Sequence, residues 1–285
     1  MAEVLRGAPV IQAMKERLIP EVEELRKKGI VPTLAIVRVG ERQEDLAYER
    51  GAKKRFETIG AQIRVVALPG DILPEDFDKT IRELNEDTSV HGILVFAPLP
   101  DHLGKNRARG LVDPKKDVDS CTEASLAGVF TGSGTGYPPC TAQAVMEILH
   151  YYGVPVEGKK AAVIGRSLII GRPAAQLLMA ENATVVNLHR KTLQPEQIAS
   201  QADILVAACG ELRLVGPAYT NPDQVVIDVG VNWDSEKGGI AGDVDFDVVE
   251  PVVKAITPVP GGVGSVTTSV LASHVIDAAK KAAGM

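Results

Sequence analysis

Short apolar runs alternate with helical stretches along this 285-residue chain, and no other feature limits its fold as strongly. Four such runs follow one another in the second half, at 159–165, 183–189, 202–208 and 224–231. Continuous apolar runs of this length are typical of strands buried on both faces of a parallel sheet. Helical segments between them favour right-handed crossovers that keep the strands parallel. The pattern predicts an α/β fold.

The first half of the chain also alternates apolar runs with helical stretches, but it contains a long irregular segment. Strands are expected at 34–40, 62–68 and 92–98, and helices at 11–28, 44–58 and 74–85. The stretch from 107 to 139 is rich in Gly, Ser, Thr and Pro and has little periodicity. Helices at 141–151 and 268–283 complete the expected elements. A domain boundary is therefore expected near residue 140.

Charge and cysteine content exclude several functional classes. The net charge of −6 gives no basic field for nucleic acid, and aromatic residues, at 4%, are too few for base stacking. The three cysteines are odd in number and never form a CxxC pair, which predicts free thiols in a cytoplasmic protein. The N-terminus does not have the pattern of a signal peptide, and no apolar run is long enough to span a membrane.

A glycine-containing turn follows the first strand of the second series. Gly165, Arg166 and Ser167 lead to Gly171, where a helix is expected to begin. Backbone N–H groups and the helix dipole at such a turn favour a pyrophosphate. The spacing is not GxGxxG, so a tight turn that needs glycine for a positive φ is the competing interpretation.

The end of the next strand indicates which dinucleotide would bind. An NAD-binding unit places an acidic residue there, whereas this chain has His189, Arg190 and Lys191. Clustered cations, with Arg166 nearby in the first turn, suit a 2′-phosphate. The sequence therefore favours NADP as the cofactor, with NAD as the alternative. A solvated basic turn is the structural alternative.

Several segments together identify a family. The chain resembles the methylenetetrahydrofolate dehydrogenase/cyclohydrolase family over nearly its full length. The most specific segments are VIGRSLIIGRPAAQLL (163–178), GDVDF (242–246) and ITPVPGGVGSVTTSVL (256–271). HGILVFAPLP (91–100), PKKDVDS (114–120) and PPCTA (138–142) add weaker matches in the family's order.

The resemblance implies two α/β domains that face a cleft, and a homodimer. Residues 1–141 with 268–285 would form a folate-binding catalytic domain, and 142–267 a Rossmann-like NADP-binding domain with a parallel sheet. Catalytic roles are implied for Tyr48, stacking on the folate ring, and Asp119, hydrogen-bonding the pterin. The implied substrate contacts are Tyr48, Phe96, Asp119, Pro260, Gly261 and Gly262, and the implied cofactor contacts are Gly165, Arg166, Ser167, Arg190, Val231 and Thr267.

The chain departs from the family pattern in its first domain. The family Tyr, matched by Tyr48, is followed four residues later by a Lys, and here that position is Ala52. Lys53 and Lys54 follow, but they lie about 100° and 200° further round a helix. The family's Gln after the third strand, which supports the Lys, is Phe96.

These departures affect one of the family's two reaction steps. In the first, a hydride passes from 5,10-methylenetetrahydrofolate to the nicotinamide and gives the methenyl cation, which requires positioning of two rings. In the second, water opens that cation to 10-formyltetrahydrofolate, which requires proton transfer worth about 10²–10⁴-fold. We therefore expect a dehydrogenase with weak or absent cyclohydrolase activity. The alternatives are a bifunctional enzyme that uses Lys53 or Lys54, and a non-catalytic folate- or NADP-binding protein.

Overall fold

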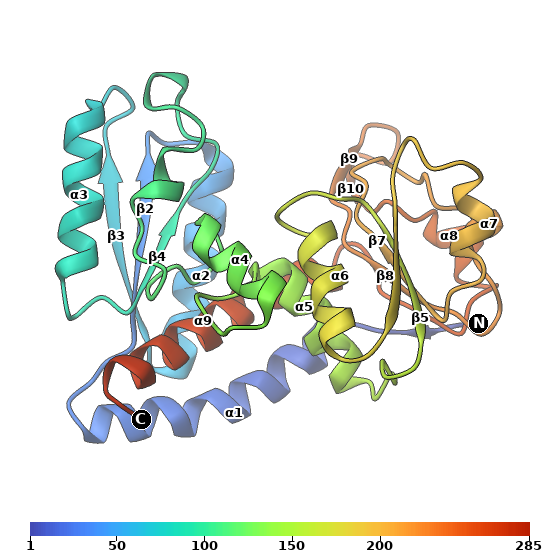
Figure 1. The fold of residues 1–285 in the computed structure, drawn as a ribbon, viewed down its shortest axis with the longest axis horizontal. Coiled ribbons are helices and arrows are strands. Elements are labelled where there is room, and N and C mark those ends of the chain that lie inside the picture. Colours follow the sequence, from blue (N-terminus) through green and yellow to red (C-terminus); the bar gives the residue numbers. More distant parts are fainter. The chain divides into compact units, whose positions relative to one another are not determined.

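The computed structural model describes all 285 residues, which divide into two compact units. The large-sheet unit contains Met1–Gln12 and Thr141–Thr267, and the small-sheet unit contains Ala13–Cys140 and Thr268–Met285. Both units combine parallel strands with helices, so the predicted two-domain α/β fold is confirmed (Figure 1). The units divide between Cys140 and Thr141 and between Thr267 and Thr268.

The large-sheet unit is built on six parallel strands in the order β1-β11-β8-β7-β5-β6. Their order requires crossovers, and the switch on either side of β5 leaves a crevice at the carboxyl ends, as in Rossmann-like sheets. The strands are β1 (Glu3–Val4), β5 (Lys160–Ile164), β6 (Thr184–Leu188), β7 (Ile204–Ala207), β8 (Val225–Asp228) and β11 (Ala255–Ile256). β7 and β8 are buried throughout, as their apolar runs predict.

Short helices and a β-hairpin complete this unit. The hairpin pairs β9 (Asn232–Asp234) antiparallel with β10 (Gly239–Ala241). Neither hairpin strand was expected from the sequence, because each has only three residues. The helices are α5 (Cys140–Tyr151), α6 (Gly171–Ala180), α7 (Pro195–Ala199), α8 (Phe246–Val249) and the 3₁₀ turn η3 (Pro217–Tyr219).

The N-terminal residues lie in the large-sheet unit, whereas the sequence assigned residues 1–12 to the first domain. The reason is a strand of only two residues, β1, which pairs in parallel with β11 through Glu3 and Val4. The backbone N–H of Gly7 also donates to the Gly261 carbonyl at 2.8 Å. A two-residue strand has no hydrophobic period, so the sequence carried no signal for it.

The small-sheet unit has three parallel strands in the order β3-β2-β4. The central strand β2 (Thr33–Val39) lies between β3 (Gln62–Leu68) and β4 (Gly92–Val95), and its Leu34–Val37 segment is fully buried. The helices are α1 (Gly7–Lys27), α2 (Gln43–Ile59), α3 (Pro74–Glu86), α4 (Glu123–Thr131) and α9 (Val263–Ala282), with 3₁₀ turns η1 (Asp101–Leu103) and η2 (Arg107–Gly110).

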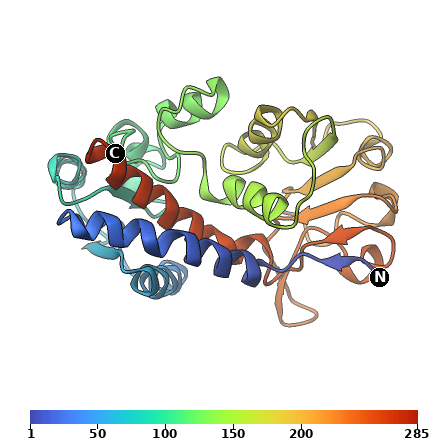
Figure 2. The ribbon, with the colours of Figure 1, turned by 90° about the horizontal axis from the view of Figure 1, so that it is seen from below.

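Helices α1 and α9 come from opposite ends of the sequence and lie side by side (Figures 1 and 2). The ammonium of Lys280 pairs with the Glu21 carboxylate at 2.8 Å, and Leu18, Val22 and Val275 are fully buried nearby in this unit. Most of the last helix, from Thr268 on, therefore packs within the small-sheet unit.

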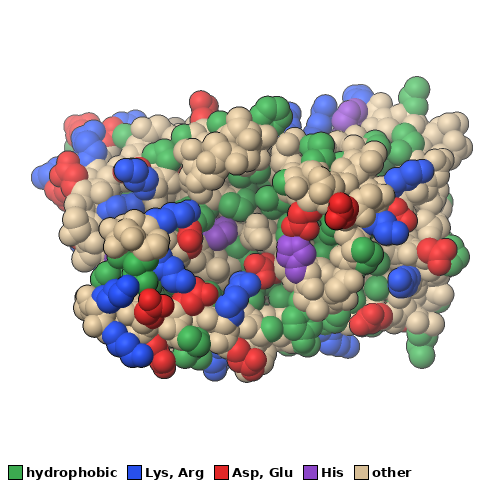
Figure 3. All heavy atoms as spheres, turned by 60° about the horizontal axis from the view of Figure 1, so that its bottom comes forward, with side chains coloured by type: hydrophobic (Ala, Val, Ile, Leu, Met, Phe, Trp, Pro, Cys, Tyr) green, Lys and Arg blue, Asp and Glu red, His purple; other side chains and the backbone are tan.

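The face drawn in Figure 3 carries acidic and basic side chains interspersed, without a broad area of one sign. None of the helices combines the length and apolar character needed to cross a membrane. No group of three or more His, Cys, Asp or Glu side chains has a geometry that could hold a metal ion.

Candidate active site

Helix α2 and the end of β4 bring together Tyr48 and Phe96, two residues for which the sequence analysis expects contact with the substrate. Ala52 lies one turn after Tyr48 on α2 and is fully buried. Phe96 follows β4 directly, where its backbone N–H donates to the Val37 carbonyl of β2 at 2.9 Å. The Phe96 and Tyr48 rings meet edge to face, with centroids 5.6 Å apart and planes at 89°. An aromatic pair therefore joins α2 to the end of β4.

Asp119 belongs to the same cluster. Its Oδ1 accepts a hydrogen bond of 2.8 Å from the backbone N–H of Cys140. Burial raises the pKa of Asp119 to about 6, the hydrogen bonds from Cys140 oppose the rise, and the Asp117 charge adds to it. Burial also raises the pKa of Tyr48 well above its usual value, with smaller contributions from Cys140 and Asp119. The structure thus brings Tyr48 close to both Phe96 and Asp119.

Neither neighbouring lysine occupies this cluster. The Lys53 ammonium donates to Glu49 Oε1 at 2.7 Å, and Arg38 holds the other oxygen of that carboxylate at 3.2 Å. Glu49 is only 7% exposed, so the carboxylate that binds Lys53 is itself held in the protein interior. Lys54 is exposed on α2. The Lys53 ammonium is therefore held by Glu49 of the same helix.

A second aspartate, Asp117, has a structural role that the sequence analysis missed. Its buried carboxylate accepts hydrogen bonds from the Cys121 and Thr122 backbone N–H groups at 2.8 Å and from the Ser125 hydroxyl at 2.6 Å. Thr122 in turn caps α4 by accepting from the Ser125 backbone N–H. These bonds fix the loop that carries Asp119. The Thr122 N-cap was a detectable signal for α4 in a stretch expected to be irregular.

The large-sheet unit has a cavity of about 740 Å³ at the carboxyl ends of β5, β6 and β7. Four residues with predicted cofactor roles line it: Gly165, Arg166, Ser167 and Arg190. Gly165 has φ +130°, and a Cβ there would overlap the Ala208 carbonyl oxygen. The Ser167 hydroxyl accepts from the Ile170 backbone N–H at 3.2 Å, just before α6 begins.

The same cavity contains an acidic residue that the sequence analysis did not single out. The Glu211 carboxylate forms an ion pair with the Arg190 guanidinium. The loop that carries Glu211 is fixed by Asp243, whose buried carboxylate accepts from the backbone N–H groups of Cys209, Gly210 and Glu211 at 2.7–3.0 Å. The matched GDVDF segment therefore positions a wall of this cavity.

The other implied contacts lie in the large-sheet unit but do not line this cavity. Val231 is 66% exposed, and the Thr267 hydroxyl donates to the Gly264 carbonyl at 3.1 Å. Pro260 and Gly261 are exposed, and Gly262 is buried. Their roles toward substrate and cofactor stay predictions.

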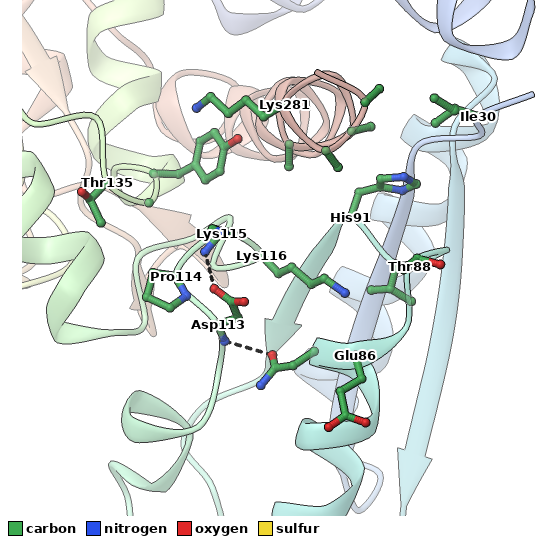
Figure 4. Close-up of a pocket in the computed structure, with 18 of the residues that line it drawn as sticks. Ile30, Glu86, Thr88, His91, Asp113, Pro114, Lys115, Lys116, Thr135 and Lys281 are labelled. Carbon is green, nitrogen blue, oxygen red and sulfur yellow. Dashed lines mark hydrogen bonds between the residues drawn. The ribbon is translucent and has the colours of Figure 1, made fainter. Parts of the chain in front are cut away.

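A second cavity, of about 790 Å³, lies within the small-sheet unit. His91, just before β4, and Lys281 of α9 line two of its sides (Figure 4). It opens at the amino end of β4, whereas Phe96 follows the carboxyl end of the same strand. None of the predicted site residues lines it, so we place the candidate site elsewhere.

Comparison with known proteins identifies both halves of the chain. Residues 5–119 match the catalytic domain of tetrahydrofolate dehydrogenase/cyclohydrolase, and residues 139–283 match its NAD(P)-binding domain. The bifunctional protein FolD of Carboxydothermus hydrogenoformans is 54% identical over 279 residues, which cover 98% of this chain and 97% of that protein.

Solved structures agree over the full length. The FolD methylenetetrahydrofolate dehydrogenase/cyclohydrolase of Campylobacter jejuni has a TM-score of 0.94 at 36% identity, covering 99% of each chain. The Trypanosoma brucei FolD, complexed with NADP and an inhibitor, has a TM-score of 0.91 at 35% identity and covers 100% of this chain and 99% of its own. The chain therefore belongs to the tetrahydrofolate dehydrogenase/cyclohydrolase family.

Proposed function

We propose that this protein oxidises 5,10-methylenetetrahydrofolate to 5,10-methenyltetrahydrofolate by hydride transfer to NADP, and hydrates that product weakly or not at all. One observation carries the second part: Ala52 is fully buried where the family has its lysine, and Phe96 packs on Tyr48 where the family has its supporting glutamine. No ammonium group is fixed in this cluster.

Hydride transfer needs little from the protein beyond placement of the two rings. The folate nitrogens stabilise the cation that forms, and NADP supplies the hydride acceptor when it is bound. Tyr48 offers an aromatic face to the folate, and the Asp119 carboxylate is an acceptor for pterin N–H groups. Pro260, Gly261 and Gly262 are proposed to contact the substrate, and Val231 and Thr267 the cofactor. These groups bind and orient, so losing a lysine leaves this step intact.

Hydration needs a group that moves a proton near the methenyl carbon. The Tyr48 phenol stays neutral because burial raises its pKa. Lys53 is neutralised by Glu49, and Lys54 is exposed. The Phe96 ring replaces a hydrogen-bonding side chain with an apolar one. This chemistry favours release of the methenyl product before water attacks it.

The cavity of the large-sheet unit supports NADP as the preferred cofactor. Arg166 and Arg190 are both exposed guanidinium groups on its wall, and a guanidinium matches a 2′-phosphate with paired donors. The backbone at Gly165 can approach a pyrophosphate closely because glycine has no Cβ. NAD is the alternative cofactor.

We also propose a homodimer in the cytoplasm. Trp233, the only tryptophan of the chain, is 69% exposed and lies opposite the 49% exposed Ile240 across the β9–β10 hairpin. A cross-strand apolar pair on an exposed hairpin is a suitable contact for a second copy. The three cysteines are unpaired, which fits a reducing compartment. Sedimentation of the purified protein and of Trp233→Ser tests the dimer.

The test of function uses the purified protein with 5,10-methylenetetrahydrofolate and NADP. Reduced cofactor is followed by absorbance, and products are separated by chromatography. Adding methenyltetrahydrofolate alone then isolates hydration from its uncatalysed background. We expect reduced cofactor with accumulating methenyl product. Rapid enzyme-dependent formation of 10-formyltetrahydrofolate would instead establish a bifunctional enzyme, the alternative favoured by the name of the Carboxydothermus relative. Binding of both ligands without turnover would establish a non-catalytic binding protein.

A further inference from the structure

We propose that Glu211 sets the balance between NADP and NAD by competing with the 2′-phosphate for Arg190. The proposal rests on the proposed function in one respect, that the large-sheet cavity receives the dinucleotide. Glu211 is the only acidic residue on the cavity wall, and its carboxylate pairs with the guanidinium that the sequence assigns to the 2′-phosphate.

The two partners meet because of the strand order. Arg190 follows β6 and Glu211 follows β7, and both strands are neighbours of β5. Their loops therefore flank the turn from Gly165 to Ser167, where a pyrophosphate would bind. Glu211 reaches across from the β7 side to pair with Arg190, which follows β6, the strand after which NAD-binding sheets carry their ribose-binding acidic residue.

Glu211 is held in place, whereas Arg190 is free to turn. The backbone N–H of Glu211 donates to the buried Asp243 at 3.0 Å, and the Glu211 side chain is 35% exposed. The Arg190 side chain is 78% exposed and makes no other ion pair. The more exposed Arg190 side chain can therefore turn to a ligand, while the Glu211 backbone stays on the cavity wall.

The Arg190–Glu211 ion pair affects the binding of the two cofactors differently. A 2′-phosphate must take Arg190 from Glu211 and then lie close to a second negative charge, which costs binding free energy. The 2′-hydroxyl of NAD carries no charge and can donate a hydrogen bond to the carboxylate. Glu211 thus lowers the preference for NADP and keeps NAD usable.

The experiment measures Kd by calorimetric titration of NADP and of NAD into the unmodified protein and into Glu211→Gln. We expect Glu211→Gln to bind NADP about tenfold more tightly, and NAD equally or several-fold less tightly. The gain for NADP should shrink as salt rises from 50 mM to 500 mM, since charges this exposed are screened. Glu157→Gln, an exposed glutamate outside the cavity, is the matched control and should change neither Kd.

A second pair of variants tests whether the effect runs through Arg190. In an Arg190→Gln background, Glu211→Gln should gain clearly less than tenfold for NADP, because the competition for the guanidinium is gone. An unchanged NADP-to-NAD ratio in Glu211→Gln overturns the inference while leaving the cavity as a dinucleotide site. Binding of neither dinucleotide to the unmodified protein overturns both the inference and the proposed function.

Discussion

The ring of Phe96 lies edge-on against the ring of Tyr48, with centroids 5.6 Å apart and planes at 89°. Such a pair is worth about 0.5–1.5 kcal/mol beyond the area it buries. It orients the Tyr48 ring. Under the proposed function, Phe96 therefore favours ring binding at Tyr48 and offers no polar side chain to support hydration.

Restoring the family residues should restore the second reaction step only when both are present. Ala52→Lys alone places an ammonium in a fully buried position beside an aromatic ring, which costs about 1–3 kcal/mol through overpacking. Phe96→Gln alone removes the ring but supplies no ammonium. The double variant should raise hydration of methenyltetrahydrofolate by about 10²-fold. The measurement is the rate of methenyl absorbance loss above the uncatalysed rate.

A double-mutant cycle tests this prediction, because the effects of the two substitutions on the hydration rate are expected to be non-additive. Single variants that each raise hydration, with effects that add, would contradict the coupling. The control is the double variant Lys54→Met with Phe96→Gln, which has the same ring removal but no added ammonium.

Removing Lys53 should leave both activities unchanged, since Glu49 already holds its ammonium at 2.7 Å. Lys53→Met is expected to keep kcat for the dehydrogenase within about twofold and to show the same hydration rate as the unmodified protein. Lys54→Met is the matched control on the exposed face. A selective loss of hydration in Lys53→Met would identify that lysine as the missing catalyst.

The pH dependence should report Asp119. Because burial raises its pKa to about 6, the carboxyl group is protonated below that pH, loses its charge and becomes a weaker acceptor for a pterin N–H. The dehydrogenase kcat/KM should therefore fall as the pH drops through about 6. Asp119→Asn should have a lower kcat/KM without this limb, and a limb that persists would assign the titration to another group.

The same shift has a consequence for stability, with a defined sign. The folded protein binds the Asp119 proton more tightly than the unfolded chain, whose carboxyl titrates near the ordinary value of 3.8. The contribution of Asp119 to stability is therefore lost as the pH rises from about 4 to about 6. Denaturant titrations should show that the free energy of unfolding falls between pH 4 and pH 6 more steeply for the unmodified protein than for Asp119→Asn.

The sequence could predict the elements whose burial is continuous. β2, β7 and β8 are largely apolar runs, and the sequence predicts β2 and β7 within two residues of their observed bounds and β8 within three. The two-residue strand β1 and the capped helix α4 were missed, because pairing with β11 and a carboxylate from Asp117 stabilise them rather than their own periodicity. Tertiary contacts determine such elements.

The candidate site likewise contains residues that the sequence could predict and contacts that it could not. Tyr48, Asp119 and Gly165 were identified because motifs around them match a family. The partner of Arg190 could not be predicted, since Glu211 is 21 residues away and follows a strand on the other side of β5. The partner of Lys53 could have been predicted from the four-residue spacing to Glu49 on one helix face.

Gly165, the one glycine that lines the large-sheet cavity, should tolerate substitution poorly. Its φ of +130° is a conformation that L residues rarely adopt, and an added Cβ would overlap the Ala208 carbonyl oxygen. Gly165→Ala is expected to lose about 1–3 kcal/mol of stability, and roughly 2–4 °C in Tm for each kcal/mol. It should also weaken NADP binding at least tenfold, because the turn must shift away from the pyrophosphate.

Gly216→Ala is the matched control, since Gly216 has φ −103° and open space around a Cβ, and it should keep both Tm and Kd. Calorimetric melting and NADP titration measure the two effects, and a Gly165→Ala protein that melts and binds like Gly216→Ala would contradict a close backbone approach at this turn.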